Sequence, residues 1–191
     1  MNKKRVGVLI SGGGSNMKAL VTAGLAKMSP FEIVCVASNN ADASGITWAR
    51  GQGIETKVIS HKDYFSREAF DAALNDYLQS QRLDFIACAG FMRIMTPVLI
   101  SPWAGRMLNI HPSLLPKYKG LHTHARAIEA GDKEAGCSVH FVTAELDGGP
   151  VIAQASVAIF AGDTPEALAA RVLVEEHKLY PHVLTEISRQ S

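Results

Sequence analysis

The sequence predicts an α/β fold: a doubly wound, mainly parallel sheet with helices on both faces. Short apolar runs alternate with segments of helical periodicity through the first half of the chain. This alternation is typical of parallel strands connected by crossover helices. The chain has 191 residues, 47% of them hydrophobic, and shows no internal repeat or linker, so we expect one domain over residues 1–191.

Apolar patterns and turn residues define the elements of the first half. The run at 31–37 is rich in β-branched residues, which favour strands, and Gly53 ends the second helical segment. The clearest helix starts at Ser66, a good N-cap, and its apolar residues recur on one face. The predicted segments are a strand at 6–10, a helix at 17–27, a strand at 31–37, a helix at 43–52, a strand at 56–59, a helix at 66–81 and a strand at 85–89.

The second half is less regular. A turn at 147–150 separates two predicted strands, and Thr164 followed by Pro165 opens the last helix. Pro181 should break or kink that helix, because proline lacks the N–H that a helix interior requires. The predicted segments are a strand at 107–110, a helix at 125–130, strands at 138–142 and 151–158, and a helix at 164–188.

A glycine-rich turn, Ser-Gly-Gly-Gly-Ser-Asn at 11–16, joins the first strand to the first helix. Glycines allow backbone N–H groups to approach an anion, and a helix N-terminus attracts it. The turn is no Walker A motif, since no Lys-Ser/Thr pair follows, and Met17 replaces the third glycine of the dinucleotide fingerprint. A phosphomonoester is therefore favoured over a dinucleotide. The alternative is an ordinary turn in which Ser15 or Asn16 caps the helix.

The loop after the strand at 85–89 is a second candidate, because ligands bind beyond the carboxyl ends of parallel strands. Phe91, Met92 and Ile94 could form a wall for a flat aromatic ligand, with Arg93 against a carboxylate. Core packing with a solvated arginine is the alternative.

The most informative stretch is Asn-Ile-His-Pro-Ser-Leu-Leu-Pro at 109–116. Asn109 and His111 lie two apart at the end of a strand, so their side chains point to the same face. A carboxamide beside an imidazole can stabilise an oxyanion and move a proton. Asp147, in a glycine-rich turn, could raise the pKa of the imidazole or relay a proton. The alternative is a carboxylate that only bonds the backbone of its turn.

Other chemistries are less favoured. His122 and His124 lack Cys or carboxylate partners at ligand spacing, so no metal is expected. No cysteine or serine stands in a recognisable nucleophile motif, so covalent catalysis has no obvious nucleophile. His140, in a predicted strand, is either a hydrogen-bonded core histidine or a support for the site.

Charge and apolar runs limit the partners. A net charge of +1 argues against a surface that coats nucleic acid, and no stretch approaches the roughly 18–20 apolar residues of a membrane span. Cys35 and Cys88 lie in apolar runs, which indicates buried, reduced thiols and a cytoplasmic protein.

The stretches 109–116 and 146–150 together resemble the formyltransferase family that uses 10-formyltetrahydrofolate. With the motifs at 14–16, 90–94 and 175–177, the chain resembles the branch that formylates 5′-phosphoribosylglycinamide in purine biosynthesis. The resemblance implies a Rossmann-like fold and direct formyl transfer through an oxyanion intermediate, with 10-formyltetrahydrofolate as co-substrate. It implies no metal, no nucleic-acid or membrane partner, and a monomer or homodimer.

The resemblance also implies a role for each matching residue. Asn109 and His111 would stabilise the oxyanion, and Asp147 would keep His111 protonated. The phosphate and ribose would be held by Gly14, Ser15, Asn16 and Glu176. The folate would contact Arg67, Met92, Arg93, Ile94, Met95, Asn109, Thr143 and Asp147. Residues 117–123 would form a mobile loop near the site.

Three alternatives remain. Formyltetrahydrofolate deformylase shares the three catalytic residues and uses water as acceptor, but it usually carries an N-terminal regulatory domain, and here the first strand begins at once. Methionyl-tRNA formyltransferase normally has a further tRNA-binding domain. A non-catalytic phosphate-binding module would leave Asn109, His111 and Asp147 without a purpose. We therefore expect an amine formyltransferase.

Overall fold

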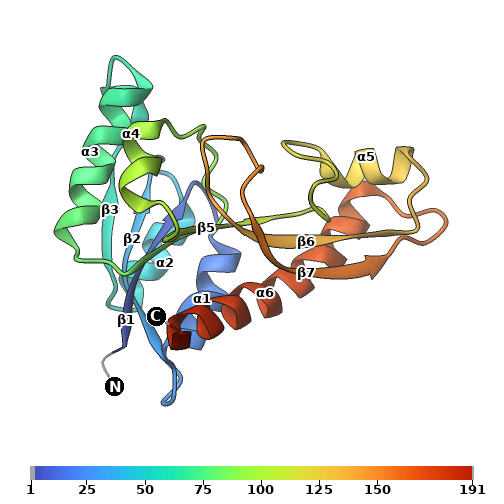
Figure 1. Cartoon of the computed structure of the whole chain (residues 1–191), viewed down its shortest axis with the longest axis horizontal. Coiled ribbons are helices and arrows are strands. Elements are labelled where there is room, and N and C mark those ends of the chain that lie inside the picture. The colour runs from blue at the N-terminus through green and yellow to red at the C-terminus, as the bar shows by residue number, and fades with distance from the viewer. Residues whose placement is uncertain (1–2, 191) are drawn as a thin grey trace.

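The computed structural model describes residues 3–190. Seven strands form a sheet in the order β3-β2-β1-β4-β5-β6-β7 (Figure 1). The first five strands pair in parallel, whereas β6 and β7 are antiparallel, which confirms the mainly parallel sheet. The strands are β1 (Lys4–Ile10), β2 (Phe31–Ser38), β3 (Glu55–Val58), β4 (Phe85–Cys88), β5 (Met107–His111), β6 (Glu134–Phe141) and β7 (Val151–Ala158).

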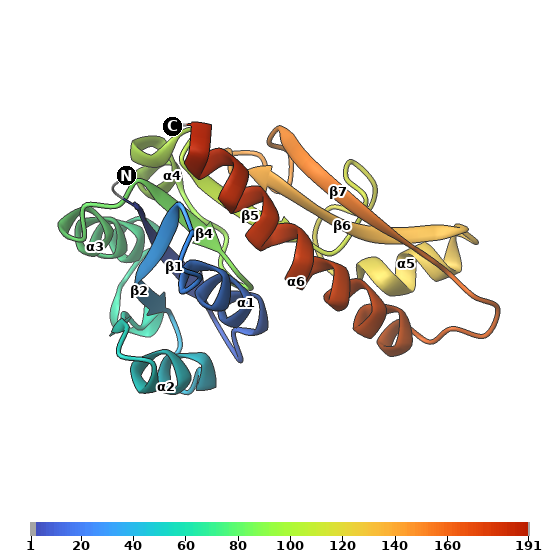
Figure 2. The ribbon, with the colours of Figure 1, turned by 90° about the horizontal axis from the view of Figure 1, so that it is seen from below.

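Helices cover both faces, as predicted. The core on one face includes residues of α1, α2, α5 and α6, and the core on the other includes residues of α3 and α4. Figure 2 shows α6 lying lengthwise beside α1 and the antiparallel end of the sheet. The helices are α1 (Ser15–Gly24), α2 (Ser44–Gly51), α3 (Arg67–Ser80), α4 (Pro97–Ile100), α5 (Thr123–Glu129) and α6 (Pro165–Gln190), with short 3₁₀ turns at His61–Asp63 and Ser101–Trp103.

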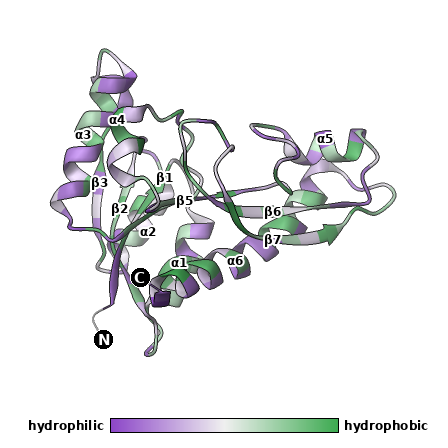
Figure 3. Cartoon of the chain, viewed as in Figure 1, coloured by the Kyte–Doolittle hydropathy of each residue, from purple (hydrophilic) through white to green (hydrophobic). Residues whose placement is uncertain are grey.

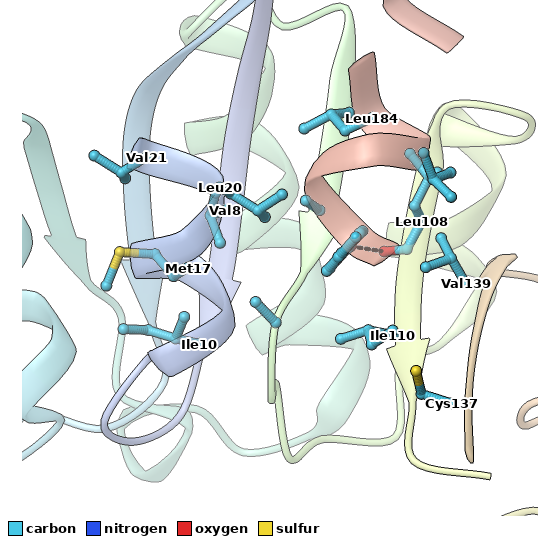
Figure 4. Close-up of a cluster of buried hydrophobic side chains, with 14 of the residues drawn as sticks. Val8, Ile10, Met17, Leu20, Val21, Leu108, Ile110, Cys137, Val139 and Leu184 are labelled. Carbon is cyan, nitrogen blue, oxygen red and sulfur yellow. Dashed lines mark hydrogen bonds between the residues drawn. The ribbon is translucent and has the colours of Figure 1, made fainter. Parts of the chain in front are cut away.

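The inner strands β1, β4 and β5 are buried on both sides, because helices cover both faces and the side chains of a strand alternate between them. In β1, Val8 and Ile10 enter the core beneath α1 and α6, while Leu9 enters the core beneath α3. Figure 4 shows the first of these cores, where β5 contributes Leu108 and Ile110. The same alternation leaves Asn109 and His111 on the opposite face.

Several local signals act as predicted. The Ser66 hydroxyl accepts a hydrogen bond from the Ala69 N–H at 3.1 Å, and Thr164 does the same for Ala167 at 3.2 Å, so both are N-caps. In Figure 3 hydrophobic and hydrophilic residues alternate along α3 and α6, as amphipathic helices require.

Several predicted bounds and one predicted break differ from the structure. The helix expected at 17–27 spans Ser15–Gly24. The strand expected at 138–142 starts at Glu134, and the glycine at position 136 explains the missed start, because glycine is depleted in strands. We predicted that Pro181 would break or kink the last helix. The proline does not break it, since α6 runs without interruption from Pro165 to Gln190. Tyr180, Val183 and Leu184 around the proline are buried in the core, and this packing holds both halves of the helix.

The topology places the site. Strand order reverses between β1 and β4, and in such sheets ligands bind beyond the carboxyl ends of the strands near this point. The segments that follow β1, β4 and β5 are the three stretches singled out in the sequence. Within the described part of the chain, every helix is too short or too polar to span a bilayer.

Candidate active site

The turn between β1 and α1 lines a cavity of about 310 Å³ together with Gly90 and Met92. Gly14 is the N-cap of α1, with a left-handed φ of +67° that favours glycine, and no side chain caps the helix. The alternative in which Ser15 or Asn16 caps the helix is therefore wrong. The first N–H groups of α1 lack a side-chain acceptor, which is the condition for binding an anion there.

Asn16 instead joins this turn to α6. Its Nδ2 donates to Oε2 of Glu176 at 2.6 Å, and both residues are buried. Burial raises the pKa of Glu176, although the hydrogen bond from Asn16 and the nearby His177 and His111 oppose the shift. The two residues predicted to bind phosphate and ribose therefore lie in contact.

His111 lies at the end of β5 and is only 6% exposed. Its Nδ1 is 3.4 Å from Oδ2 of Asp147, and its Nε2 is 2.9 Å from the carbonyl oxygen of Tyr118. Both ring nitrogens thus face acceptor oxygens, and a doubly protonated ring can donate to both. The predicted pairing of the imidazole with Asp147 is present.

Asp147 is held by residues from other parts of the chain. Its side chain is 8% exposed, and Oδ2 also accepts from the Gly120 N–H at 2.9 Å. The chain returns tightly behind it at Gly149, where a Cβ would collide with the carbonyl of Phe141. The alternative of a carboxylate that bonds only its own turn is therefore wrong.

His140 on β6 was left open by the sequence, and the structure places it in the site. Burial lowers the pKa of its ring, so the ring is neutral near pH 7. We assign its proton to Nδ1, which lies 2.9 Å from the Phe141 carbonyl oxygen, and Nε2 then accepts from Nδ2 of Asn109 at 3.2 Å. His140 thereby orients the carboxamide, and Oδ1 of Asp147 is 3.7 Å from its Nε2. Only the register of β5 against β6, which sets Asn109 opposite His140, could have revealed this.

The segment predicted as a loop near the site does lie against it. Residues 117–123 supply both the Tyr118 carbonyl and the Gly120 N–H described above. Arg126 on α5 donates to the carbonyls of Lys119 and Leu121, at 2.7 and 3.2 Å. The loop therefore contacts both members of the His111–Asp147 pair, while its predicted mobility stays a prediction.

In the segment after β4, some side chains fit the predicted ligand wall and others fit the alternative of core packing. Met92 and Ile94 are 68% and 60% exposed, which suits a ligand wall. Phe91 and Met95 are half-buried and pack against the core, so the core-packing alternative holds for Phe91. Arg93 is not fully solvated: its Cζ lies 5.9 Å from the centre of the Phe70 ring.

The remaining predicted folate contacts lie at the edges of this region. Arg67 is exposed in the first turn of α3, one turn before Phe70. Thr143 follows β6, and its hydroxyl is 3.4 Å from the Glu145 carbonyl oxygen. Among residues 3–190, no three His, Cys, Asp or Glu side chains are grouped closely enough to share a metal ion. All three cysteines are free and buried, as expected for Cys35 and Cys88.

Comparisons with known proteins agree with this geometry. The family described as formyl transferase matches residues 4–184. Phosphoribosylglycinamide formyltransferase of Escherichia coli (strain K12) is 51% identical over 178 residues, which cover 93% of this chain and 84% of that protein. The enzyme of the same name from Haemophilus influenzae is 46% identical over 95% of this chain and 85% of its own length. The crystal structure of the Brucella melitensis phosphoribosylglycinamide formyltransferase superposes with a TM-score of 0.94 at 50% identity, covering 98% of this chain and 96% of that one. The chain therefore belongs to the formyl transferase family and, within it, groups with the phosphoribosylglycinamide formyltransferases.

Proposed function

We propose that Asn109, His111 and Asp147 carry out the formyl transfer that this chain catalyses in purine biosynthesis. Phosphoribosylglycinamide formyltransferase activity follows from family membership and the 51% identity to the Escherichia coli enzyme. The observation that supports the residue roles is the buried cluster at the end of β5, where His111 faces Asp147 at 3.4 Å and His140 orients Asn109.

In the proposed reaction, 10-formyltetrahydrofolate donates the formyl group and the amine of 5′-phosphoribosylglycinamide attacks its carbon. A C–N bond forms, and the formyl oxygen becomes an oxyanion that Asn109 Nδ2 and the His111 ring stabilise by donating hydrogen bonds. A proton then moves from the attacking nitrogen to N10 of the folate, with His111 as the shuttle, and the C–N10 bond breaks. The products are formylglycinamide ribonucleotide and tetrahydrofolate. Because Nε2 of His111 contacts Tyr118, this contact has to open before Nε2 can reach the substrate.

The binding roles are proposed on the same basis. The N–H groups at Gly14, Ser15 and Asn16 would hold the phosphate, and Glu176 would accept from the ribose hydroxyls. The exposed Met92 and Ile94 would form a wall for the flat pterin ring. The other folate contacts would be Arg67, Arg93, Met95, Asn109, Thr143 and Asp147. None of these roles requires a metal.

We also propose that residues 1–191 act as one formyltransferase domain in the cytoplasm, as a monomer or homodimer, without a nucleic-acid or membrane partner. The free, buried thiols support a reducing compartment. The net charge of +1 supports small-molecule substrates over nucleic acid.

The experiment that tests this proposal measures tetrahydrofolate formation from 10-formyltetrahydrofolate with and without 5′-phosphoribosylglycinamide. We expect turnover only when the amine is present. Equal turnover without it would identify a deformylase, and binding of both compounds without turnover would identify a non-catalytic module.

Replacing Glu176 with Gln should weaken substrate binding and raise the stability of the fold. The KM for the ribonucleotide should rise roughly 10-fold or more, because the neutral amide accepts weaker hydrogen bonds from the ribose. The melting temperature should rise at pH 7, because burial raises the pKa of Glu176 and the folded state holds its proton more tightly than the unfolded chain. That carboxyl destabilises the fold increasingly as pH rises from its ordinary value of 4.5 through the folded pKa. The gain should therefore shrink toward pH 5 in calorimetry. Glu175→Gln, one residue away and paired with Lys178, is the control and should change neither quantity.

Replacing His140 with Leu should lower kcat about 10- to 100-fold, because Asn109 loses its acceptor and its donor is no longer aimed at the formyl oxygen. His140→Gln retains a side-chain acceptor and should recover part of the loss. Steady-state kinetics with both substrates saturating would check this. A His140→Leu enzyme with unchanged kcat would show that Asn109 does not need this support.

A further inference from the structure

The segment 91–96, between β4 and α4, is tied at both ends by side chains that have no role in the mechanism above. Met92 and Ile94 between these ties are exposed. Phe91 and Met95 pack against the core, but Met92 and Ile94 do not, so the positions of these two side chains depend on how the backbone of the segment is held. The two ties come from Ser11 after β1 and Asp71 on α3.

The first tie is a directed chain of hydrogen bonds. The Met92 N–H donates to the Ser11 hydroxyl at 2.8 Å, and that hydroxyl donates to Oδ1 of Asn39 at 2.5 Å. The Ser11 N–H donates to the Gly90 carbonyl at 3.0 Å. Nδ2 of the buried Asn39 lies 3.2 Å from Nδ1 of His61. The Ser11 hydroxyl uses its donor and its acceptor capacity at once, and among small side chains only a hydroxyl does this.

The second tie is a buried carboxylate. Asp71 is 1% exposed, and its Oδ2 accepts from the Thr96 N–H at 2.6 Å. Thr96 is the N-cap of α4, so this bond fixes the point where the segment enters the helix. Phe70, the preceding residue of α3, contacts the Arg93 guanidinium. A buried carboxylate is kept in place only where its partners compensate for lost water.

We propose that Ser11 and Asp71 are positioning residues that hold the two ends of segment 91–96 in the geometry that binds the formyl donor. The inference rests on the proposed function in one respect, that Met92 to Met95 contact the folate. Neither side chain is assigned a contact with the substrates. Loss of a tie would let the segment sample other positions. Part of the binding free energy of 10-formyltetrahydrofolate would then be used to order the segment, and the observed affinity would fall.

This role predicts a change in one kinetic constant. Ser11→Ala should raise the KM for 10-formyltetrahydrofolate about two- to tenfold, the size of one hydrogen bond, with kcat and the ribonucleotide KM changed by less than about twofold. A general loosening of the phosphate turn would raise both KM values. Ser29→Ala is the matched control, because the Ser29 hydroxyl also bonds the backbone, at Phe31, the first residue of β2, away from the site.

Asp71 offers a test of its own. Asp71→Ala should raise the donor KM in the same way, whereas Asp71→Asn keeps an oxygen that accepts from the Thr96 N–H and should stay within about twofold of wild type. Melting curves verify that each variant is folded at the assay temperature. If Asp71→Ala does not fold, Ser11→Ala and Asp71→Asn still decide the matter.

The experiment is steady-state kinetics of the whole chain with both substrates varied. A rise confined to the donor KM in Ser11→Ala, absent in Ser29→Ala and Asp71→Asn, supports the proposal. An unchanged donor KM in Ser11→Ala, an equal rise in both KM values, or a loss in Asp71→Asn equal to that in Asp71→Ala overturns it. Failure of the proposed function is separate, because the wild-type enzyme would then show no turnover that depends on 5′-phosphoribosylglycinamide.

Discussion

Replacing His111 with alanine should lower kcat by about 10²- to 10⁴-fold, the range measured for removing a positioned general acid–base group or an oxyanion donor. The imidazole serves both purposes here. It lies at the end of β5 beside Asn109, and its Nδ1 faces the Asp147 carboxylate at 3.4 Å. Alanine leaves the backbone of the strand intact, so the phosphate turn and segment 91–96 keep their positions. The KM values should therefore change little.

The measurement is kcat and KM for both substrates, with tetrahydrofolate release as the signal. His182→Ala is a suitable control, because His182 is exposed on α6 and should leave turnover unchanged. Since His111 is 6% exposed, the variant also leaves a cavity, so its melting temperature is needed beside its kinetics. Turnover within a few fold of wild type in a folded His111→Ala enzyme would remove His111 from the proposed mechanism.

The parts of the fold that the sequence predicts are those set by local rules. The β1 and β2 runs are apolar and β-branched, and Ser66 caps α3, so their positions follow from propensity and capping. Pro181 shows where local rules fail. The core packing of Tyr180 and its neighbours outweighs the lost helical hydrogen bond, and packing of this kind depends on residues far away in the sequence.

The candidate site divides in the same way. Asn109 and His111 could be paired from strand periodicity, and Asp147 joined them through resemblance. The position of His140 depends on the register of β5 against β6, and the ties from Ser11 and Asp71 cross 81 and 25 residues of sequence. No period or motif encodes such contacts. They arise where β1 lies beside β4, where β6 lies beside β5 and where α3 packs on α4, and only the folded chain displays them.

Replacing Asp147 with asparagine should lower kcat by a similar factor, about 10²- to 10⁴-fold, while preserving the geometry of the site. The two oxygens of Asp147 have different partners. Oδ2 faces the Gly120 N–H and Nδ1 of His111, and Oδ1 lies 3.7 Å from Nε2 of His140. In the variant, the amide oxygen can keep the first position. The amide nitrogen then lies near Nε2 of the neutral His140 ring, whose one acceptor site is already used by Nδ2 of Asn109. The substitution therefore removes the charge and little else.

That property makes Asp147→Asn the sharper test of mechanism. If the carboxylate only holds residues 117–123 through Gly120, the amide oxygen can do the same and kcat should stay close to wild type. If its charge stabilises the His111 imidazolium that forms during proton transfer, kcat should fall by orders of magnitude while both KM values remain near wild type. Asp76→Asn on the exposed side of α3 removes the same charge from a distant surface and should have no effect on either constant. A large rise in the KM for 10-formyltetrahydrofolate with little loss of kcat would instead show that Asp147 acts only through its proposed contact with the folate, and the proton shuttle would have to be assigned to His111 without it.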